Sequence, residues 1–252
     1  MLHTHTKTPA ASPAHPPAET LVAALNARLR HHGATDALRA AFSALPNLAL
    51  VSSFGAESVV LLHLAAMVKR DVPVLFIDTE MLFPETLIYQ QDVAERLRLK
   101  NLKIVRAGNL PTEDPDKTLH QRDKDACCDL RKTKPLQQAL QSYDGWITGR
   151  KRYQSGKRAA LEFFEVEAET GRIKVNPLAR WRPEDVQEYL VENRLPRHPL
   201  VAQGYPSIGC APCTSKVAPG EDPRAGRWRG EDKDECGIHF VDGKLVRTGA
   251  ST

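Results

Sequence analysis

The amino-acid sequence predicts an α/β protein with a mostly parallel sheet and flanking helices. Two observations predict this fold class. Short apolar runs of the buried-strand type recur along the chain, and stretches with helical periodicity separate them. Strands that alternate with helices form right-handed crossover units and parallel neighbours. Ligands of such sheets bind at the carboxyl ends of the strands, so the residues just after each predicted strand are the first candidates for a functional site.

The amino-terminal half supplies most of this alternation. Two helices are expected first, over residues 19–32 and 36–45, and Gly33 is expected to end the first. Three strands then alternate with two helices, in the order 48–53 (strand), 59–69 (helix), 74–78 (strand), 84–99 (helix) and 102–105 (strand). The loops that begin at Ser52 and Asp78 therefore fall at the carboxyl end of the sheet.

The later elements are shorter. A polar loop over 111–124 is expected to lead into a helix that carries Cys127 and Cys128, and glycine and proline indicate loops after Pro196. Between them the sequence predicts a strand, a basic segment, a hairpin and a last helix, over residues 145–149, 150–158, 163–166 with 173–175, and 183–194.

A single α/β domain is expected to hold these elements, over residues 18–230. Residues 1–17 are rich in Thr, His, Ala and Pro and predict a disordered leader. Residues 231–252 begin with a solvated charged stretch and are expected to form a mobile carboxyl-terminal arm.

Charge and hydropathy narrow the class of protein. The formal net charge is +4, and clusters such as residues 150–152 suit a small polyanion as well as a nucleic-acid backbone. No run of about eighteen apolar residues exists, so no membrane span is expected. The leader lacks the apolar region of an export signal, which together with a metal-type cysteine pattern predicts a cytoplasmic protein.

Four of the cysteines point to a shared metal centre. Cys127 and Cys128 are adjacent, and because consecutive Cα atoms lie ~3.8 Å apart, below the usual ~4.4–6.8 Å of a disulfide, the pair is unsuited to bond to itself. Cys210 and Cys213 form a C-x-x-C pair. Four thiolates suit zinc or an iron–sulfur cluster. Adjacent cysteines at one helix end favour the separated iron corners of a [4Fe–4S] cluster, although spacing alone leaves both metals open.

The fifth cysteine, Cys236, stands apart from these four. It follows the acidic stretch 231–235, so we expect it on an exposed and mobile segment. Nearby cations depress the pKa of a thiol and make it a better nucleophile. His239, Arg224 and Arg227 could supply them once the segment folds down. An idle surface cysteine is the alternative.

The loop over residues 53–58, Ser-Phe-Gly-Ala-Glu-Ser, can aim backbone N–H groups and a helix amino terminus at a phosphate. A tight turn without a ligand is the alternative. The loop resembles the Ser-Gly-Gly-x-Asp-Ser loop of the adenine nucleotide alpha hydrolase class, with Phe54 in place of one glycine. That replacement argues against an enzyme that splits ATP at its pyrophosphate.

Five motifs in order carry a more specific resemblance. They are Cys127-Cys128-Asp129-Leu130-Arg131-Lys132, Trp146-Ile147-Thr148-Gly149, Lys174-Val175-Asn176-Pro177-Leu178, the stretch 204–213 from Gly204 to Cys213, and Glu235-Cys236-Gly237-Ile238-His239. From about residue 52 to residue 239 the chain resembles the assimilatory adenylyl-sulfate (APS) reductases, the cluster-bearing branch of the phosphosulfate reductase family. The resemblance implies an adenine nucleotide alpha hydrolase-like fold and an oxidoreductase that reduces APS in sulfate assimilation and cysteine biosynthesis.

The resemblance also implies roles for the cysteines. A [4Fe–4S] cluster is expected on Cys127, Cys128, Cys210 and Cys213. The Cys236 thiolate is expected to attack the sulfur of APS, so that AMP leaves and an S-sulfocysteine remains. Thioredoxin or a glutaredoxin then releases sulfite. A homo-oligomer is suggested by the resemblance alone.

Sulfuryl transfer moves negative charge onto a phosphate leaving group, so catalysis needs cations and oriented N–H groups more than a general base. We therefore expect basic side chains on the phosphosulfate, namely Arg158, Arg224, Arg227 and His239, with Arg150 and Lys151 as weaker candidates. Small residues of the loop are expected to hold the nucleotide, namely Ser53, Gly55 and Ser58. Lys132 is expected to hydrogen-bond near the cluster and tune the field around the sulfate.

Other functions are weighed against this one. Related enzymes without the cluster cysteines use the 3′-phosphorylated substrate (PAPS), and some with them accept both, but the cluster ligands here favour APS. An iron–sulfur tRNA sulfurtransferase should carry the intact glycine-rich loop, which Phe54 interrupts. An iron–sulfur redox sensor should carry a DNA-binding helix pair, which we do not find, so no nucleic-acid partner is expected.

Overall fold

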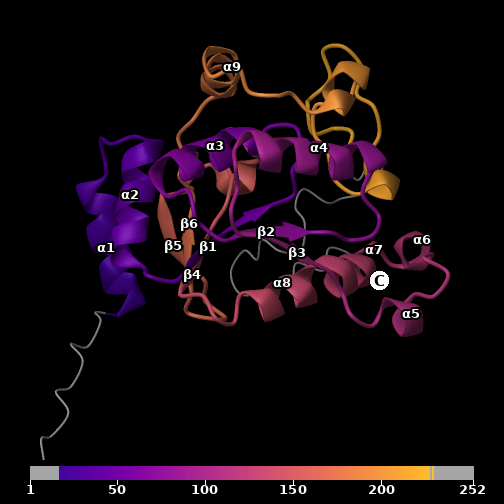
Figure 1. The fold of residues 1–252 in the computed structure, drawn as a ribbon, viewed down its shortest axis with the longest axis horizontal. Coiled ribbons are helices and arrows are strands. Elements are labelled where there is room, and N and C mark those ends of the chain that lie inside the picture. The colour runs from indigo at the N-terminus through magenta and orange to yellow at the C-terminus, as the bar shows by residue number, and fades with distance from the viewer. Residues whose placement is uncertain (1–16, 228, 230–252) are drawn as a thin grey trace, which may run out of the picture.

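A six-stranded sheet lies at the centre of the protein in the computed structural model, which describes residues 17–227 and 229 (Figure 1). The strand order is β3-β2-β1-β4-β6-β5. The strands are β1 (Leu48–Ser52), β2 (Val74–Ile77), β3 (Leu102–Val105), β4 (Gly145–Ile147), β5 (Phe164–Val166) and β6 (Ile173–Val175). Every neighbouring pair is parallel except β5 with β6, which forms the predicted hairpin. The prediction of a mostly parallel α/β sheet is confirmed.

Helices and short turns connect the strands. The α-helices are α1 (Ala18–Arg28), α2 (Ala34–Ala44), α3 (Ser58–Val68), α4 (Pro84–Arg96), α5 (Leu110–Glu113), α6 (Leu119–Arg122), α7 (Lys124–Cys128), α8 (Lys134–Ala139) and α9 (Pro183–Glu192). A π-helix and four 3₁₀ helices complete the described elements: η1 (Asp129–Thr133), η2 (Arg152–Gln154), η3 (Gly156–Arg158), η4 (Pro199–Gln203) and η5 (Ala211–Cys213). Within the described residues, no helix combines the length and the apolar character that a bilayer crossing requires.

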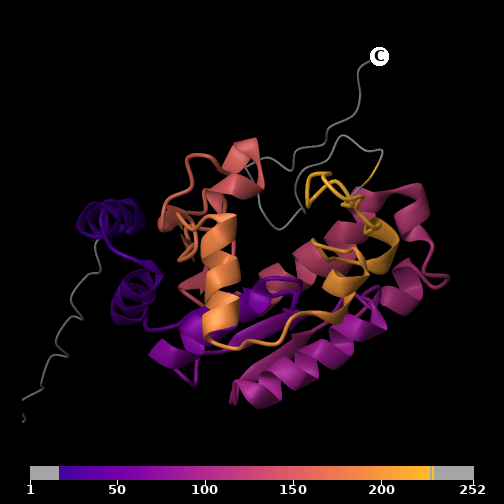
Figure 2. The ribbon, with the colours of Figure 1, turned by 90° about the horizontal axis from the view of Figure 1, so that it is seen from above.

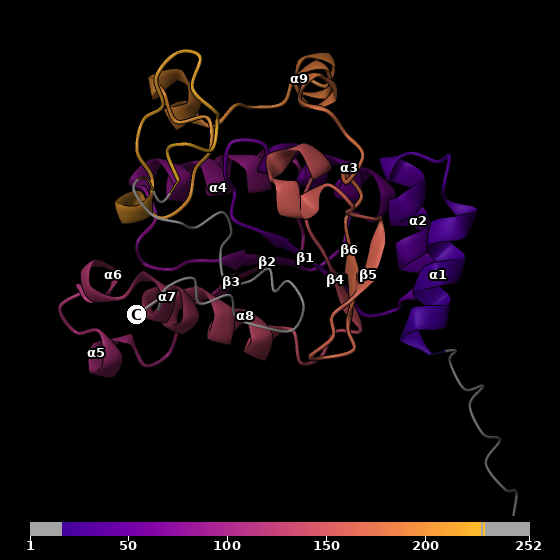
Figure 3. The same ribbon diagram turned by 180° about the vertical axis from the view of Figure 1, so that it is seen from behind.

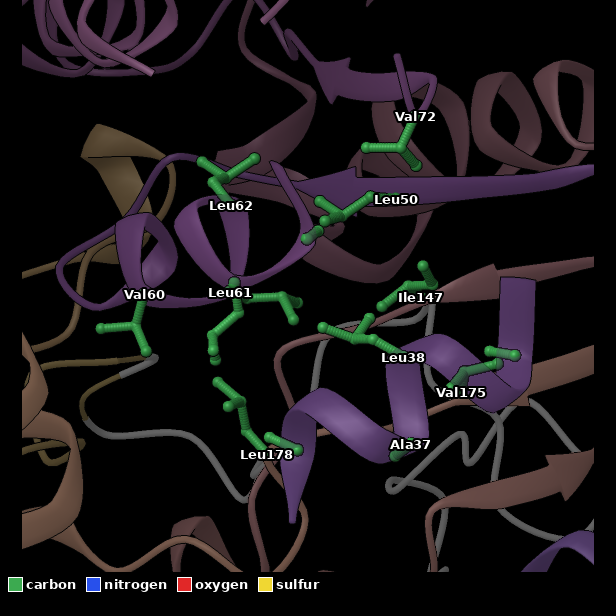
Figure 4. Packing of buried hydrophobic residues seen from close by; sticks show 14 of the residues in the cluster. Ala37, Leu38, Leu50, Val60, Leu61, Leu62, Val72, Ile147, Val175 and Leu178 are labelled. Atoms are coloured by element: carbon green, nitrogen blue, oxygen red, sulfur yellow. The ribbon is translucent and has the colours of Figure 1, made fainter. Parts of the chain in front are cut away.

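The sheet is covered on both faces. α3 and α4 lie on one face, and α7 and α8 lie on the other (Figures 1 and 3). Alternate strand residues therefore enter different cores: Leu50 packs on the α3 side, whereas Ala49 and Leu75 pack with Leu136 of α8. Burial on both faces explains why these strands are continuous apolar runs in the sequence. Figure 4 shows the larger core, where side chains of α2, α3 and the sheet gather.

Helix α1 lies beside the edge strand β5 and covers its free edge (Figure 1). Asn26 of α1 donates a hydrogen bond to the Phe164 carbonyl at 2.9 Å and accepts one from the Phe164 N–H at 3.0 Å. An edge strand exposes unpaired backbone groups, and this side-chain amide satisfies one donor and one acceptor of β5. The helix ends at Arg28, four residues before the predicted end, because the chain turns back there through the His32 N–H to the Leu29 carbonyl.

Two segments differ from the sequence-based expectation. The predicted loop over 111–124 contains the short helices α5 and α6, and the carboxylate of Asp114 between them accepts the Leu119 N–H at 2.9 Å. The helix that begins before Cys127 passes into the π-helix η1 and then α8, so the adjacent cysteines precede a widened turn. After α9 the chain passes over α4, which η4 contacts (Figures 1 and 2).

The expected leader and arm are not tested. Residues 1–16 and 230–252 lie outside the described part of the chain, and only Pro17 of the predicted leader lies within it. The division into a leader, one domain over 18–230 and an arm over 231–252 stays a prediction.

Candidate functional site at the carboxyl end of the sheet

The order of the strands reverses between β1 and β4. From β1 the chain builds β2 and β3 on one side, whereas β4 pairs with β1 on the other side. Such a switch point opens a crevice at the carboxyl ends of the strands, where open α/β sheets bind their ligands. The loops after β1 and β4 meet there, because Lys151 Nζ lies 2.7 Å from Glu57 Oε2.

The loop after β1 brings together the three residues expected to hold the nucleotide. A Cβ atom built on Gly55 would lie 3.6 Å from Ser53 Oγ and 3.9 Å from Ser58 Oγ. It would also lie 3.1 Å from the carbonyl oxygen of Ile208, so a side chain here would press on the segment that leads to Cys210. Ser58 is the first residue of α3, whose amino terminus favours negative charge. The loop is therefore small, polar and suited to an anionic ligand.

Phe54, the residue in place of a loop glycine, has two roles in the structure. Its φ is +48°, a left-handed conformation that glycine adopts more easily than other residues. Its side chain is fully buried and packs edge to face on Phe76, with ring centroids 5.2 Å apart. The Phe54 N–H donates to Ser52 Oγ at 3.1 Å. The backbone keeps a glycine-like turn, and the ring anchors that turn to the core.

Basic side chains gather on the other wall of the crevice. Burial lowers the pKa of Lys151, Glu57 opposes that shift, and the charges of Arg158 and Arg224 lower it further. Arg158 is buried and donates to Gln154. The structure thus brings the predicted Arg158 and Arg224 within electrostatic range of Lys151.

The carboxylate of Glu57 also accepts hydrogen bonds from the hydroxyl of Tyr153, at 3.3 Å and 3.1 Å. Burial raises the pKa of Tyr153 and the charge of Glu57 raises it further, so its hydroxyl stays protonated. Sequence reasoning missed Glu57 and Tyr153. The acidic residue stands in the predicted loop, but nothing in the sequence pairs it with a lysine 94 positions away.

Arg150 belongs to the framework of the crevice. Its guanidinium pairs with Glu165, and its Nη2 and Nε donate to Asn176 Oδ1 at 3.0 Å and 3.2 Å. Thr148 Oγ1 donates to the same amide oxygen at 3.1 Å. These contacts tie β4 to β5 and β6, and the ranking of Arg150 below Arg158 as a substrate-binding residue stays a prediction.

Arg227 lies on the backbone of Gly209. A Cβ atom on Gly209 would fall 2.3 Å from Arg227 Nη2, so the guanidinium needs the absence of a side chain there. The backbone of Arg227 also forms an isolated antiparallel β-bridge with Thr214. The Ile208 carbonyl lies against Gly55, and Gly209 is the next residue. Arg227 therefore contacts the segment that packs on the loop after β1.

The cysteines gather next to this crevice, at the end of β2. Cys210 Sγ lies 3.2 Å from Thr79 Oγ1, and the Ala211 N–H donates to the Met81 carbonyl at 2.7 Å. Burial raises the pKa of Cys127, Arg131 opposes the shift, and the charges of Cys210 and Cys213 raise it. Three of the four predicted ligands thus lie within electrostatic range of one another.

None of the four cysteines in the described part is joined to another by a disulfide. Within residues 17–227 and 229, no three His, Cys, Asp or Glu side chains are arranged to hold a metal ion. The set of side chains itself fits an iron–sulfur cluster, because the convergent groups are thiols and the hydroxyl of Thr79 lies within hydrogen-bond distance of one of the sulfurs.

A buried ion pair supports the cysteine region. Arg131 Nη2 lies 2.6 Å from Asp114 Oδ2, and Arg131 Nη1 donates to the Thr79 carbonyl at 2.9 Å. Sequence reasoning named Arg131 only as a motif residue and did not name Asp114. Lys132, expected near the cluster, is half-buried in η1.

Cys236 and His239, the expected nucleophile and its companion, lie outside the described residues. Their roles therefore stay predictions. The described chain ends next to the crevice, since Arg227 is one of its last residues and packs on Gly209.

Fold and site together define an α/β protein that gathers cations and thiols at one edge of a parallel sheet. Comparison with known proteins gives the family. The model of the phosphoadenosine phosphosulfate reductase domain matches residues 47–216, which hold the whole sheet and four cysteines. The chain belongs to this family.

Individual relatives agree with the family. An adenosine 5′-phosphosulfate reductase from Chelativorans sp. (strain BNC1) is 50% identical over 195 residues, covering 77% of this chain and 79% of the relative. A phosphoadenosine 5′-phosphosulfate reductase from Gloeobacter violaceus is 42% identical over 199 residues, covering 76% and 82%. The crystal structure of phosphoadenylyl-sulfate reductase from Candida auris, a phosphate complex, is 31% identical with a TM-score of 0.69 and covers 78% of this chain and 96% of that one.

Proposed function

We propose that this protein is an oxidoreductase that reduces adenosine 5′-phosphosulfate to sulfite and AMP in sulfate assimilation and cysteine biosynthesis. The observation that carries the proposal is the contact of Lys151 with Glu57, which joins the basic segment after β4 to the small polar loop at the switch point, where the charges of Arg158 and Arg224 also act on Lys151. Membership of the reductase family and the name of the Chelativorans relative support it.

The proposed reaction has two steps. The Cys236 thiolate attacks the sulfur of the sulfate, a new S–S bond forms, and the S–O bond to the phosphate breaks, so AMP leaves with the electron pair. The product is an S-sulfocysteine. One thiolate of a reduced dithiol, thioredoxin or a glutaredoxin, then attacks the Cys236 sulfur and expels sulfite, and its second thiol restores the free Cys236 as the dithiol is oxidised to a disulfide.

The described residues supply the charge that this step needs. Negative charge moves onto the phosphate oxygen as the S–O bond breaks, so preorganised cations stabilise the transition state more than the ground state. The charges of Arg158 and Arg224 act on Lys151, and Arg227 packs on Gly209, next to the Ile208 carbonyl that lies against Gly55. His239 is proposed to join them when the arm that carries Cys236 closes.

The four cysteines Cys127, Cys128, Cys210 and Cys213 are proposed to hold a [4Fe–4S] cluster. When bound, such a cluster would organise this edge of the sheet and add its field to that of the cations around the sulfate. Lys132 is proposed to tune that field. Zinc is the alternative metal for the same thiols, and iron and acid-labile sulfide analysis separates the two.

The name of the Gloeobacter relative favours one further possibility, a preference for the 3′-phosphorylated nucleotide or use of both nucleotides. A cytoplasmic location, expected from the metal-type cysteine pattern, and a homo-oligomer, suggested by the family resemblance, also belong to the proposal.

The test is the intact mass of anaerobically purified protein after mixing with APS, and separately with PAPS, in the absence of any thiol. We expect the mass to rise by one sulfite unit with APS and to stay unchanged in Cys236→Ser. Addition of reduced thioredoxin should then release sulfite. No adduct with either nucleotide, from protein with its full iron and sulfide content, would overturn the proposed function.

A further inference from the structure

The carboxyl ends of β2 and β3 carry an arginine–carboxylate pair that the proposed reaction does not use. Asp78 follows β2 and Arg106 follows β3, and the Nε and Nη2 atoms of Arg106 both lie 2.8 Å from Asp78 Oδ2. The side chain of Asp78 is 5% exposed, whereas that of Arg106 is 54% exposed. A buried carboxylate is costly unless it is paired, so Arg106 stabilises this charge from the solvent side.

The other oxygen of Asp78 shapes the turn that follows it. Asp78 Oδ1 accepts a hydrogen bond from the Glu80 N–H at 2.9 Å. Glu80 has a φ of +56°, a left-handed conformation that is unfavourable for a residue with a side chain, so the turn depends on a contact that holds it. The Asp78 N–H donates to the Val105 carbonyl at 2.9 Å and ties the start of the turn to β3. Arg106 thus fixes the carboxylate, and the carboxylate fixes the turn.

Thr79, the middle residue of this turn, contacts one of the four cysteines. Its side chain is buried, and its Oγ1 lies 3.2 Å from Cys210 Sγ and accepts the Met81 N–H at 3.3 Å. The Met81 carbonyl in turn accepts the Ala211 N–H at 2.7 Å. The chain after β2 therefore holds Cys210 through a side-chain contact to its sulfur and through a backbone contact to the next residue.

These contacts form a continuous path from an exposed guanidinium to a cysteine sulfur. Without Arg106, the buried carboxylate would lose its cation, turn toward water and release the Glu80 N–H. The left-handed turn would then relax and carry Thr79 away from the sulfur. We propose that Arg106 is a positioning residue for the metal ligand Cys210, and that it acts through the buried carboxylate of Asp78 and the turn. This inference rests on the metal centre of the proposed function and not on its reaction.

The test measures how fast the protein gives up its metal, with no nucleotide present. Anaerobically purified protein is mixed with a chelator, and the release of iron, or of zinc if that is the metal, is followed with time. Arg106→Met should release the metal about tenfold faster than the wild type, because contacts that support metal ligands are worth roughly 10–100-fold in affinity. Arg106→Lys keeps a cation and should lie closer to the wild type. Arg96→Met is the matched control: Arg96 is 58% exposed, but its partner Asp92 is 44% exposed, so its release rate should be that of the wild type.

Two double variants separate positioning from damage to the fold. Asp78→Asn removes the buried charge, and its amide oxygen can still accept the Glu80 N–H. Asp78→Asn/Arg106→Met should therefore release its metal more slowly than Arg106→Met alone. In a Thr79→Val background, Arg106→Met should add nothing, because the contact through which it acts is already lost. A destabilised fold would instead give additive effects and no rescue.

The outcomes distinguish this inference from the proposed reaction. Unchanged metal release in Arg106→Met, or additive effects of Arg106→Met and Thr79→Val, would overturn the inference. Wild-type protein that holds neither iron nor zinc would overturn it together with the proposed metal centre. Wild-type protein that holds its metal but forms no sulfite adduct would overturn the proposed reaction alone, because none of the release measurements uses APS.

Discussion

Two cation–carboxylate pairs hold the carboxyl edge of the sheet, and they differ in how far water reaches them. Arg131 and Asp114 are 2.6 Å apart with side chains 1% and 0% exposed. Lys151 and Glu57 are 2.7 Å apart, but the carboxylate is 27% exposed. The first pair is closed, with further hydrogen bonds to the Leu119 N–H and the Thr79 carbonyl. The second is open on the side of the crevice.

The difference separates a framework from a recognition site. A buried ion pair is shielded from a ligand in solution, and its value lies in fixing the segments that it joins. An ion pair that water reaches can still interact electrostatically with a ligand that enters the crevice. The cysteine region is therefore built on the buried pair, and the proposed nucleotide region on the pair that water reaches. The segment 204–213 joins them, because Ile208 touches the Gly55 position and Cys210 contacts Thr79.

The largest expected effect comes from breaking the closed pair. Asp114→Asn leaves Arg131 as an uncompensated buried charge, which should lower the free energy of unfolding by about 3–5 kcal/mol. Chemical denaturation at pH 7 measures it. Burial alone would raise the pKa of Asp114, but hydrogen bonds from Arg131 and the backbone hold it below 3.8. The wild-type advantage is therefore present above that value and disappears as the pH falls through the folded-state pKa.

The control for that prediction is Asp92→Asn, which removes a carboxylate whose side chain is 44% exposed from its pair with Arg96. Exposed pairs add little to stability, so the change should be far smaller. Equal losses of unfolding free energy for the two substitutions would show that burial does not determine how much an ion pair contributes to the stability of this protein.

The open region depends on Phe54 for its shape. Phe54→Ala removes a fully buried ring and should cost about 3–4 kcal/mol of unfolding free energy. Because the ring anchors the turn, the KM for APS should also rise. Phe163→Ala, a buried phenylalanine that stacks with Arg180, should cost as much stability with no change in KM. A rise in KM for both variants would contradict the anchoring role.

The chain just before the segment 204–213 is fastened to α4 by a buried histidine, His198. The Leu200 N–H donates to His198 Nδ1 at 3.2 Å, so Nε2 carries the proton and donates to Thr86 Oγ1 at 3.0 Å. Burial lowers the pKa of His198 from 6.5 to about 4. Between these two pKa values the imidazole of His198 is protonated in the unfolded chain and neutral in the folded chain. The free energy of unfolding should therefore fall by about 3 kcal/mol as the pH is lowered from 6.5 to 4.

His198→Gln removes this titration. Its unfolding free energy should be lower than that of the wild type at pH 7 and should depend less on pH between 6.5 and 4. Denaturant midpoints measured across that range check the difference. Parallel pH profiles for the two proteins would contradict the assignment of a neutral, buried His198.

Sequence reasoning reached the sheet, and the position of the loop after its first strand, for a physical reason. Strands buried on both faces appear as continuous apolar runs, such as Val74–Ile77, and the residues after them fall at one edge whatever the order of the strands. Ser53, Gly55 and Ser58 follow from that rule alone. Arg158 and Arg224 were expected from the chemistry, and the structure brings both to Lys151.

The ion pairs could not be predicted in the same way. Asp114 and Arg131 are joined only because a predicted loop folds as two short helices, and Glu57 and Lys151 meet only because β4 pairs with β1. Both ion pairs depend on the tertiary structure, which the local periodicity of apolar residues does not encode. The π-helix after Cys128 also has no signal in the pattern of apolar residues.

The smallest expected effect tests the contact between the two regions. Gly55→Ala places a methyl group 3.1 Å from the Ile208 carbonyl, so the joining segment must shift by a few tenths of an ångström. We expect a loss of stability of about 1 kcal/mol or less and a rise of about tenfold in the KM for APS, because the shift opens the loop over the nucleotide. Gly108→Ala meets nothing within 4 Å and serves as the control. An unchanged KM in Gly55→Ala would show that the nucleotide loop and the cysteine segment act independently.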